Sequence, residues 1–160
     1  MAERTSVRKR ALMKRLCDDA TIVSLIDNHS VTDPYDLINR NIFPMLHVPE
    51  PTEEAKVIIC TKLDYPTIPR RNDLLKNCVL TFTVLAHNEH NTTTITGDAR
   101  TDLIVEQLIE IFAFNIVDSV FRWEPTSDTE GAFTEDWYSR TIIFKAVDYN
   151  ELDMGKRVNG

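Results

Sequence analysis

Apolar and polar residues alternate along residues 79–86, the most regular pattern in the chain. The apolar positions are Leu80, Phe82, Val84 and Ala86, and the polar positions between them include Thr81 and Thr83. Because successive side chains of a strand point to opposite faces of a sheet, this alternation predicts a strand packed against a core on one face.

From Asp98 onward the hydrophobic period becomes that of a helix. Its apolar stripe consists of Ile104, Leu108, Ile111 and Phe112, and its polar side of Asp102, Glu106, Gln107 and Glu110. Asp98 is placed to cap the free N–H groups of the first turn. This segment is therefore predicted to be a long helix that covers the apolar face of the sheet.

Three further helices are predicted before residue 44. The first spans residues 4–17 and has a narrow apolar seam of Val7, Ala11, Leu12 and Leu16. A short second helix spans residues 20–27. Asp33 as the cap, Pro34 as the first residue and Pro44 as a stop predict a third helix over residues 34–43.

Three more strands are predicted from runs rich in β-branched and aromatic residues. They span residues 56–63, 119–124 and 138–147, and in the last one Ile142, Phe144 and Ala146 face inward. The strand from 56 and a strand over 76–86 are expected to form an antiparallel hairpin. Residues 125–136, with turn formers and acidic groups, are predicted to be a long solvated loop.

These elements predict an α+β fold in which N-terminal helices precede a four-stranded, mainly antiparallel sheet in the order β-β-α-β-β. One long helix packs on one face of that sheet. A chain of 160 residues fits a single domain, here residues 1–150. Its helical part spans residues 1–50, the sheet with its covering helix spans residues 55–148, and residues 149–160 form a tail.

The composition, with 42% hydrophobic and 27% charged residues, is that of a soluble globular protein. No apolar run approaches the roughly 20 residues of a membrane span, and the basic N-terminus lacks the apolar stretch of a secretory signal. Cys17, Cys60 and Cys78 are odd in number and widely spaced. We therefore expect folding in a reducing, intracellular compartment, with all three as small buried residues.

The net charge of −7 is unevenly distributed, because residues 1–15 carry +5 and the remainder −12. An acidic body argues against tight wrapping of duplex DNA, although DNA can pass such a surface without sticking. The basic helix over 4–17 leaves three alternatives open: a solvated helix resting lightly on the body, docking onto an acidic neighbour, or contact with nucleic acid.

Few residues suggest chemistry. His87-x-x-His90, beside Glu89, has the spacing of metal ligands, but zinc sites need three or four ligands on rigid elements, so the alternative is an exposed polar loop. Carboxylates at Asp64, Asp73 and Asp98 could hold magnesium in a nuclease. Each is better explained as a turn or cap residue, and we expect no cofactor, no metal and no enzymatic activity.

Charged residues around the long helix are candidates for a subunit contact. Asp102, Glu106 and Glu110 form a row that is either solvated or meets a neighbouring subunit. Arg100 lies in the first turn, where the helix dipole disfavours a cation. We therefore expect Arg100 to pair with an acid outside its own helix; it is either a surface residue or part of an intersubunit salt bridge.

Three segments together resemble the tail terminator and tail-completion (head–tail joining) proteins of tailed bacteriophages. They are IPRRNDLLKNCVLTFTVLAHNEH, the helix DARTDLIVEQLIEIF, and the final strand RTIIFKAVDYN. The resemblance covers about residues 55–150 and includes Arg100, Asp102, Arg140 and Asp148. Residues 1–50 are not placed by it.

The resemblance implies a non-enzymatic virion protein of the neck, assembled in the host cytoplasm. Its subunits would form a homo-oligomeric ring, usually a hexamer, that ends the tail tube and joins it to the head–tail connector. DNA would pass through the lumen unbound. The alternatives are a head-closure or adaptor ring, another protein-interaction module, and the metal-dependent nuclease.

Under this resemblance, loops 87–97 and 125–137 would reach adjacent subunits, and exposed strand edges could pair between them. The basic N-terminal helix and the acidic body would supply opposite charges for a contact between two different faces. The residues expected at subunit interfaces are Arg70, Arg71, His87, His90, Arg100, Asp102, Glu106, Glu110 and Arg140.

Overall fold

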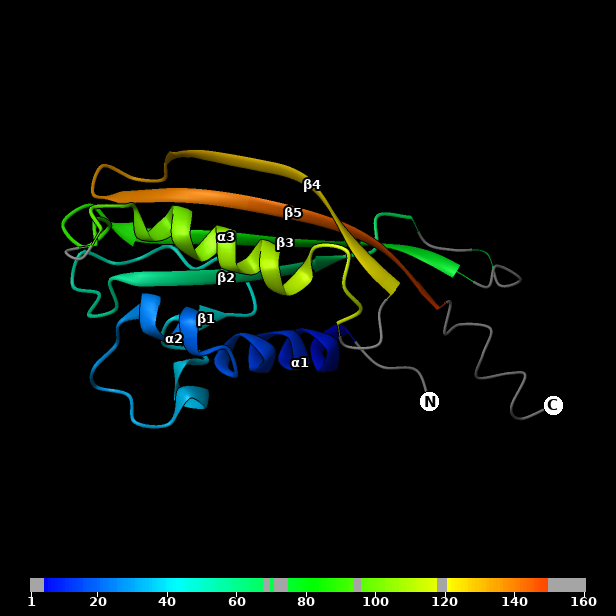
Figure 1. Cartoon of the computed structure of the whole chain (residues 1–160), viewed down its shortest axis with the longest axis horizontal. Helices are drawn as coiled ribbons and strands as arrows, with labels where there is room; N and C mark the ends of the chain where they lie inside the picture. The colour runs from blue at the N-terminus through cyan, green and yellow to red at the C-terminus, as the bar shows by residue number, and fades with distance from the viewer. Residues whose placement is uncertain (1–4, 68–69, 71–74, 94–95, 118–120, 150–160) are drawn as a thin grey trace.

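The computed structural model describes residues 5–67, 70, 75–93, 96–117 and 121–149. Its elements follow one another in the order α1 (Thr5–Cys17), α2 (Ala20–Ile26), the 3₁₀ turn η1 (Pro34–Leu37), β1 (Ile42–Phe43), β2 (Val57–Asp64), β3 (Leu75–His87), α3 (Arg100–Phe112), β4 (Phe121–Ala132) and β5 (Trp137–Tyr149). The fold is α+β, as predicted, and α3 lies along the sheet (Figure 1). Among the described residues, no helix has the length and apolarity to cross a membrane. The expected tail from residue 150 lies outside this description.

Within the described residues the strands form one mixed sheet in the order β1-β2-β3-β5-β4. β2 and β3 form the expected antiparallel hairpin, with Val57 opposite Ala86. The prediction of four mainly antiparallel strands is only roughly matched, because a fifth strand, β1, pairs in parallel with β2 through Ile42 and Ile59.

β1 arises where the helix predicted over residues 34–43 stops early. Asp33 caps this turn as expected, its carboxylate accepting a hydrogen bond from the Tyr35 N–H at 3.0 Å. However, η1 ends at Leu37, and Asn39 has a φ of 67°, a left-handed conformation that asparagine tolerates better than most residues. This bend carries the chain to the edge of β2 and replaces the second half of the predicted helix.

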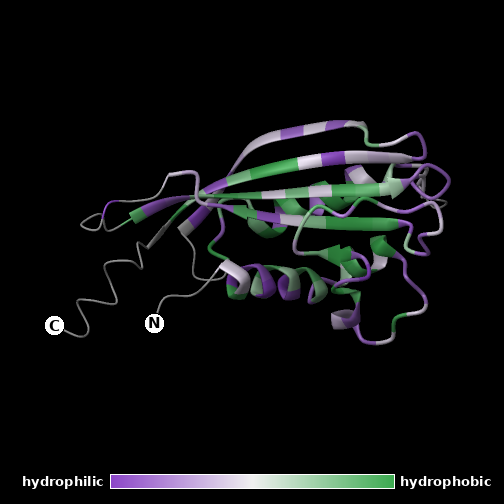
Figure 2. Ribbon diagram, turned by 180° about the vertical axis from the view of Figure 1, so that it is seen from behind, coloured by the Kyte–Doolittle hydropathy of each residue, from purple (hydrophilic) through white to green (hydrophobic). Residues whose placement is uncertain are grey.

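The prediction of a solvated loop over residues 125–136 is wrong, because most of that segment belongs to β4. Glu130 pairs with Arg140 and Ala132 with Tyr138, so only four residues connect β4 to β5. Pro125 lies at a shift in the pairing register, where an edge strand tolerates proline. Figure 2 shows the outcome: β4 is largely hydrophilic, whereas β2 and β3 carry long hydrophobic stretches.

The main core lies between the helices and the sheet. Phe112 of α3 packs against Phe82 of β3 and Phe144 of β5, with ring centroids 5.2 and 5.6 Å apart. The predicted inward faces of β3, α3 and β5 are all buried, as are the three cysteines. Burial raises the pKa of the Cys17 thiol to about 11, so this thiol stays protonated at neutral pH.

Helix α1 is part of this core and does not rest lightly on the body. Leu12 and Leu16 are at most 1% exposed, and Met13 and Cys17 are also buried. Val7, predicted to lie in the apolar seam, is instead 44% exposed. The predicted seam is displaced from the buried face of α1, because Met13 and Cys17 extend that face on one side only.

We expect Leu16→Ala to lower the free energy of unfolding by about 2–5 kcal/mol, because it leaves a cavity under α1. Val7→Ala, the matched control on the exposed side, should change it by less than about 0.5 kcal/mol. Urea unfolding followed by circular dichroism measures both. Equal, small effects would contradict the placement of α1 in the core.

Candidate functional site at the start of the long helix

The loop between β3 and α3 closes the N-terminal end of α3. The Asn91 side-chain oxygen accepts a hydrogen bond from the Thr101 backbone N–H at 3.2 Å, and the Asn91 carbonyl accepts one from the Arg100 N–H. The prediction that Asp98 caps this helix is wrong. The N-cap position is Ala99, which offers no side-chain cap, and Asp98 is exposed.

Arg100 ties this loop to α2. Its guanidinium donates to the carbonyl oxygens of His90, at 2.9 Å, and Leu25, at 3.0 Å. It also lies 3.5 Å from the Asp27 carboxylate. Arg100 therefore pairs with an acid outside its own helix, as expected, and that acid is in the same chain. Because Leu25 lies in the last turn of α2, the cation meets the negative end of that helix dipole.

The two histidines of the predicted ligand pair lie in different surroundings. His87 packs edge-on against Trp137, with ring centroids 5.5 Å apart. His90 lies 3.7 Å from Asp27, and burial, together with the nearby Arg100 charge, lowers its pKa. Among the described residues, no three or more His, Cys, Asp or Glu side chains are grouped as metal ligands.

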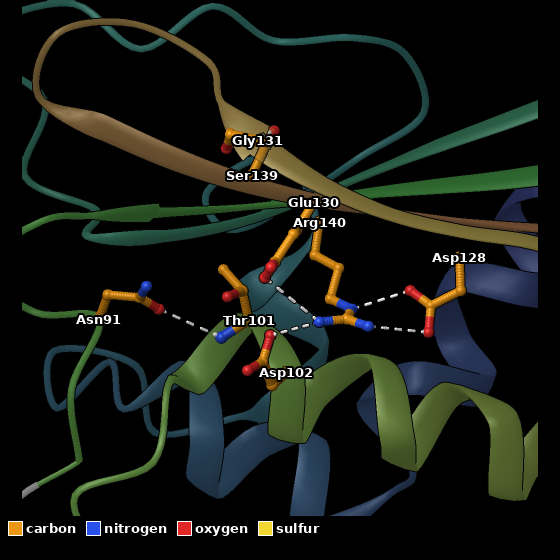
Figure 3. Close-up of polar contacts among 8 residues, drawn as sticks. All are labelled: Asn91, Thr101, Asp102, Asp128, Glu130, Gly131, Ser139 and Arg140. Atoms are coloured by element: carbon orange, nitrogen blue, oxygen red, sulfur yellow. Dashed lines mark hydrogen bonds and ion pairs between the residues drawn. The ribbon is translucent and has the colours of Figure 1, made fainter.

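Arg140 of β5 joins three elements through carboxylates (Figure 3). It makes a two-bond contact with Asp128 of β4, at 2.8 and 3.0 Å. It also donates to Asp102 of α3 at 2.8 Å and to Glu130 of β4 at 3.4 Å. Its paired contact with Asp128 is the geometry in which arginine binds a carboxylate most strongly.

This cluster holds the polar edge of the sheet against α3. The hydrogen bonds to Asp128 raise the pKa of Arg140 above its already high value, so its charge is permanent. Sequence reasoning missed Asp128 and Glu130 because it placed them in a loop. Their spacing of two, in a segment that returns toward Arg140, was the available signal.

Glu106 and Glu110 are exposed on α3 and line a groove of about 600 Å³ between α2 and α3. Gln107 donates to the carboxylate of Asp19, the N-cap residue of α2, at 3.0 Å. Leu25 and Leu103 are half-buried in the groove wall. Of the helix residues predicted to lie at subunit interfaces, these two glutamates are the exposed ones.

The remaining predicted residues that the structure describes do not join this site. Arg70 is exposed in the β2–β3 connection, and Arg71 lies outside the described residues. Asp64 ends β2 and lies 3.4 Å from the Lys62 ammonium group. Asp98 comes in the chain after β3, whose last residues pair with the start of β2. The start of β2 and Asp64 at its end are seven residues apart, or about 23 Å along the strand. Asp64 and Asp98 therefore do not converge, and Asp73 lies outside the description.

The Asn91 cap yields a direct test. We expect Asn91→Ala to lower the free energy of unfolding by about 1 kcal/mol, since α3 loses a side-chain cap. Asp98→Ala, the cap expected from the sequence, should have an effect within about 0.5 kcal/mol. The reverse order of the two effects in urea unfolding would restore Asp98 as the cap.

Comparison with known proteins gives one family. A search of curated proteins finds no match to the chain. Residues 14–146 match the family described as YomW. Because that match covers most of its length, the chain belongs to the YomW family, which is a phage-derived family.

Proposed function

We propose that this chain is a non-enzymatic structural protein of the phage neck. Copies of it form a hexameric ring that ends the tail tube and joins it to the head–tail connector. The phage-derived family supports a virion role. Terminating the tube is favoured over head closure by the resemblance of residues 55–150 to tail terminators.

The observation that carries this proposal is that two patches of exposed apolar side chains lie on different elements. The first patch is Met45, Leu46 and Val48, which are 57–63% exposed in the segment after β1. The second patch is Leu75 and Val147, which are 48% and 37% exposed. Exposed apolar groups of this kind mark protein contacts, and a joining protein needs one surface for each neighbour.

The second patch lies where the sheet extends past its hairpin. Residues 75–77 of β3 pair with β5 beyond Asp64, the last residue of β2 to pair with β3. Figure 1 shows this end projecting beyond the helices. Leu75 and Val147 fall on its face away from the helices, since the buried side chains of β3 and β5 alternate with them. A projecting, partly apolar end of this shape can reach an adjacent ring.

The outer edge of the sheet offers a third contact. Residues 127–132 of β4 pair with β5 alone among the described strands, so their outer backbone groups can pair with another chain. Acidic side chains on this strand are exposed, and residues 16–160 sum to −12. An acidic ring would repel the phosphates of a passing genome, which favours sliding over binding.

The proposal is tested by native mass spectrometry of the chain and by electron microscopy of tail tubes and connectors mixed with it. We expect ring-sized oligomers, alone or on tubes, that cap tube ends. Leu75→Glu and Leu46→Glu should each weaken binding to one of the two partners by about tenfold or more and spare the other, because each breaks one apolar patch.

Thr52→Glu, which adds a charge at an exposed polar position, is the matched control and should bind both partners normally. A chain that stays monomeric on tubes and connectors, or that cleaves DNA in a magnesium-dependent way, would contradict the proposal. Normal binding of both partners by both patch variants would contradict the assignment of the patches.

A further inference from the structure

The groove between α2 and α3 is acidic at its rim and apolar at its wall. Glu106 and Glu110 stand one helical turn apart on α3, and like charges at this spacing repel each other. Leu25 and Leu103 line the same groove. The bonds from Gln107 to Asp19 and from Arg100 to the Leu25 carbonyl fix both walls. The groove is thus already formed, and a cationic ridge with an apolar residue would relieve its repulsion.

Helix α1 carries such a ridge on its outer side. Val7, Arg10 and Lys14 follow one another at helical spacing, opposite the buried Leu12 and Leu16. All three ridge residues are exposed. Within the part of the chain that the structure describes, neither Arg10 nor Lys14 forms an ion pair. Arg10 and Lys14 are four residues apart, as are Glu106 and Glu110, so both pairs span about 6 Å along their helices.

The ridge and the groove belong to different regions of one chain. The ridge begins near the start of α1, which Figure 1 shows away from α2, and within the described residues neither Arg10 nor Lys14 forms an ion pair with Glu106 or Glu110 of its own chain. A second copy can therefore supply the ridge without competition from the first. Two different faces that meet in this way make a head-to-tail contact, which closes into a ring when the rotation between copies allows it.

We propose that the α2–α3 groove of one copy receives the α1 ridge of the next copy. In this contact, Val7 packs on Leu25 and Leu103, and the two basic residues pair with the two glutamates. The inference rests on the proposed ring and names the surfaces that build it. It also selects docking onto an acidic neighbour among the roles open to the basic helix.

Two charge-reversal variants test the contact. The groove variant carries Glu106→Lys and Glu110→Lys, and the ridge variant carries Arg10→Glu and Lys14→Glu. Each variant alone places like charges across the contact, so we expect its association to weaken about tenfold or more at low salt. A 1:1 mixture places opposite charges at every contact and should recover oligomers in which the two variants alternate. Native mass spectrometry resolves these species by mass.

The matched control carries Glu50→Lys and Glu54→Lys, the same charge change at the same sequence spacing on exposed residues outside the groove. It should assemble like the wild type, and circular dichroism verifies that all variants fold. Assembly of either variant alone at wild-type strength, or a mixture that stays monomeric, would overturn the contact while leaving the ring intact. A wild type that never assembles, even on tail tubes, would contradict the proposed function instead.

Discussion

The contact between Arg140 and its three carboxylates decides how the outer strand of the sheet is held. On the inner strands, α3 covers apolar side chains such as Phe82 and Phe144. On β4 the helix-facing positions 128 and 130 are acidic, and Asp102 of α3 meets them. Three carboxylates facing one another would repel, and breaking a partly buried arrangement of this kind by removing its cation is costly. Arg140 therefore allows a charged strand to complete an otherwise apolar layer.

The charged residues divide into those bonded within the chain and those that remain exposed for partners. Arg100 and Arg140, both expected at subunit interfaces, are bonded to groups of their own chain. Glu106 and Glu110, in contrast, are exposed beside a groove. A partner would therefore meet the outer face of α3 and the projecting end of the sheet, and the bonds of Arg100 hold α3 against α2 beside the groove. This division underlies the proposed role in a phage-derived assembly.

Regular periodic segments could be predicted from the sequence, because burial alone determines their pattern. The stripe from Ile104 to Phe112 and the alternation in β3 are of this kind. The second part of β4, residues 125–132, could not be predicted, since its Asp, Glu and Gly residues have loop propensities and Arg140, which stabilises it, lies on another strand. A two-residue strand such as β1 carries too little pattern to detect. Asn91 lies ten residues before Thr101 in the sequence, so this cap depends on the path of the intervening loop, and Asp98, close to the helix in sequence, was the wrong choice.

Hydrogen–deuterium exchange of an Arg140→Gln variant tests the role of this contact most directly. We expect faster exchange in β4 and in the first turn of α3, with the β2–β3 hairpin unchanged. Lys145→Gln removes a charge from the same strand on its other face, and it should leave all three segments unchanged. Exchange in β4 and α3 that is identical in the Arg140 variant and the wild type would contradict the claim that this contact holds the sheet edge.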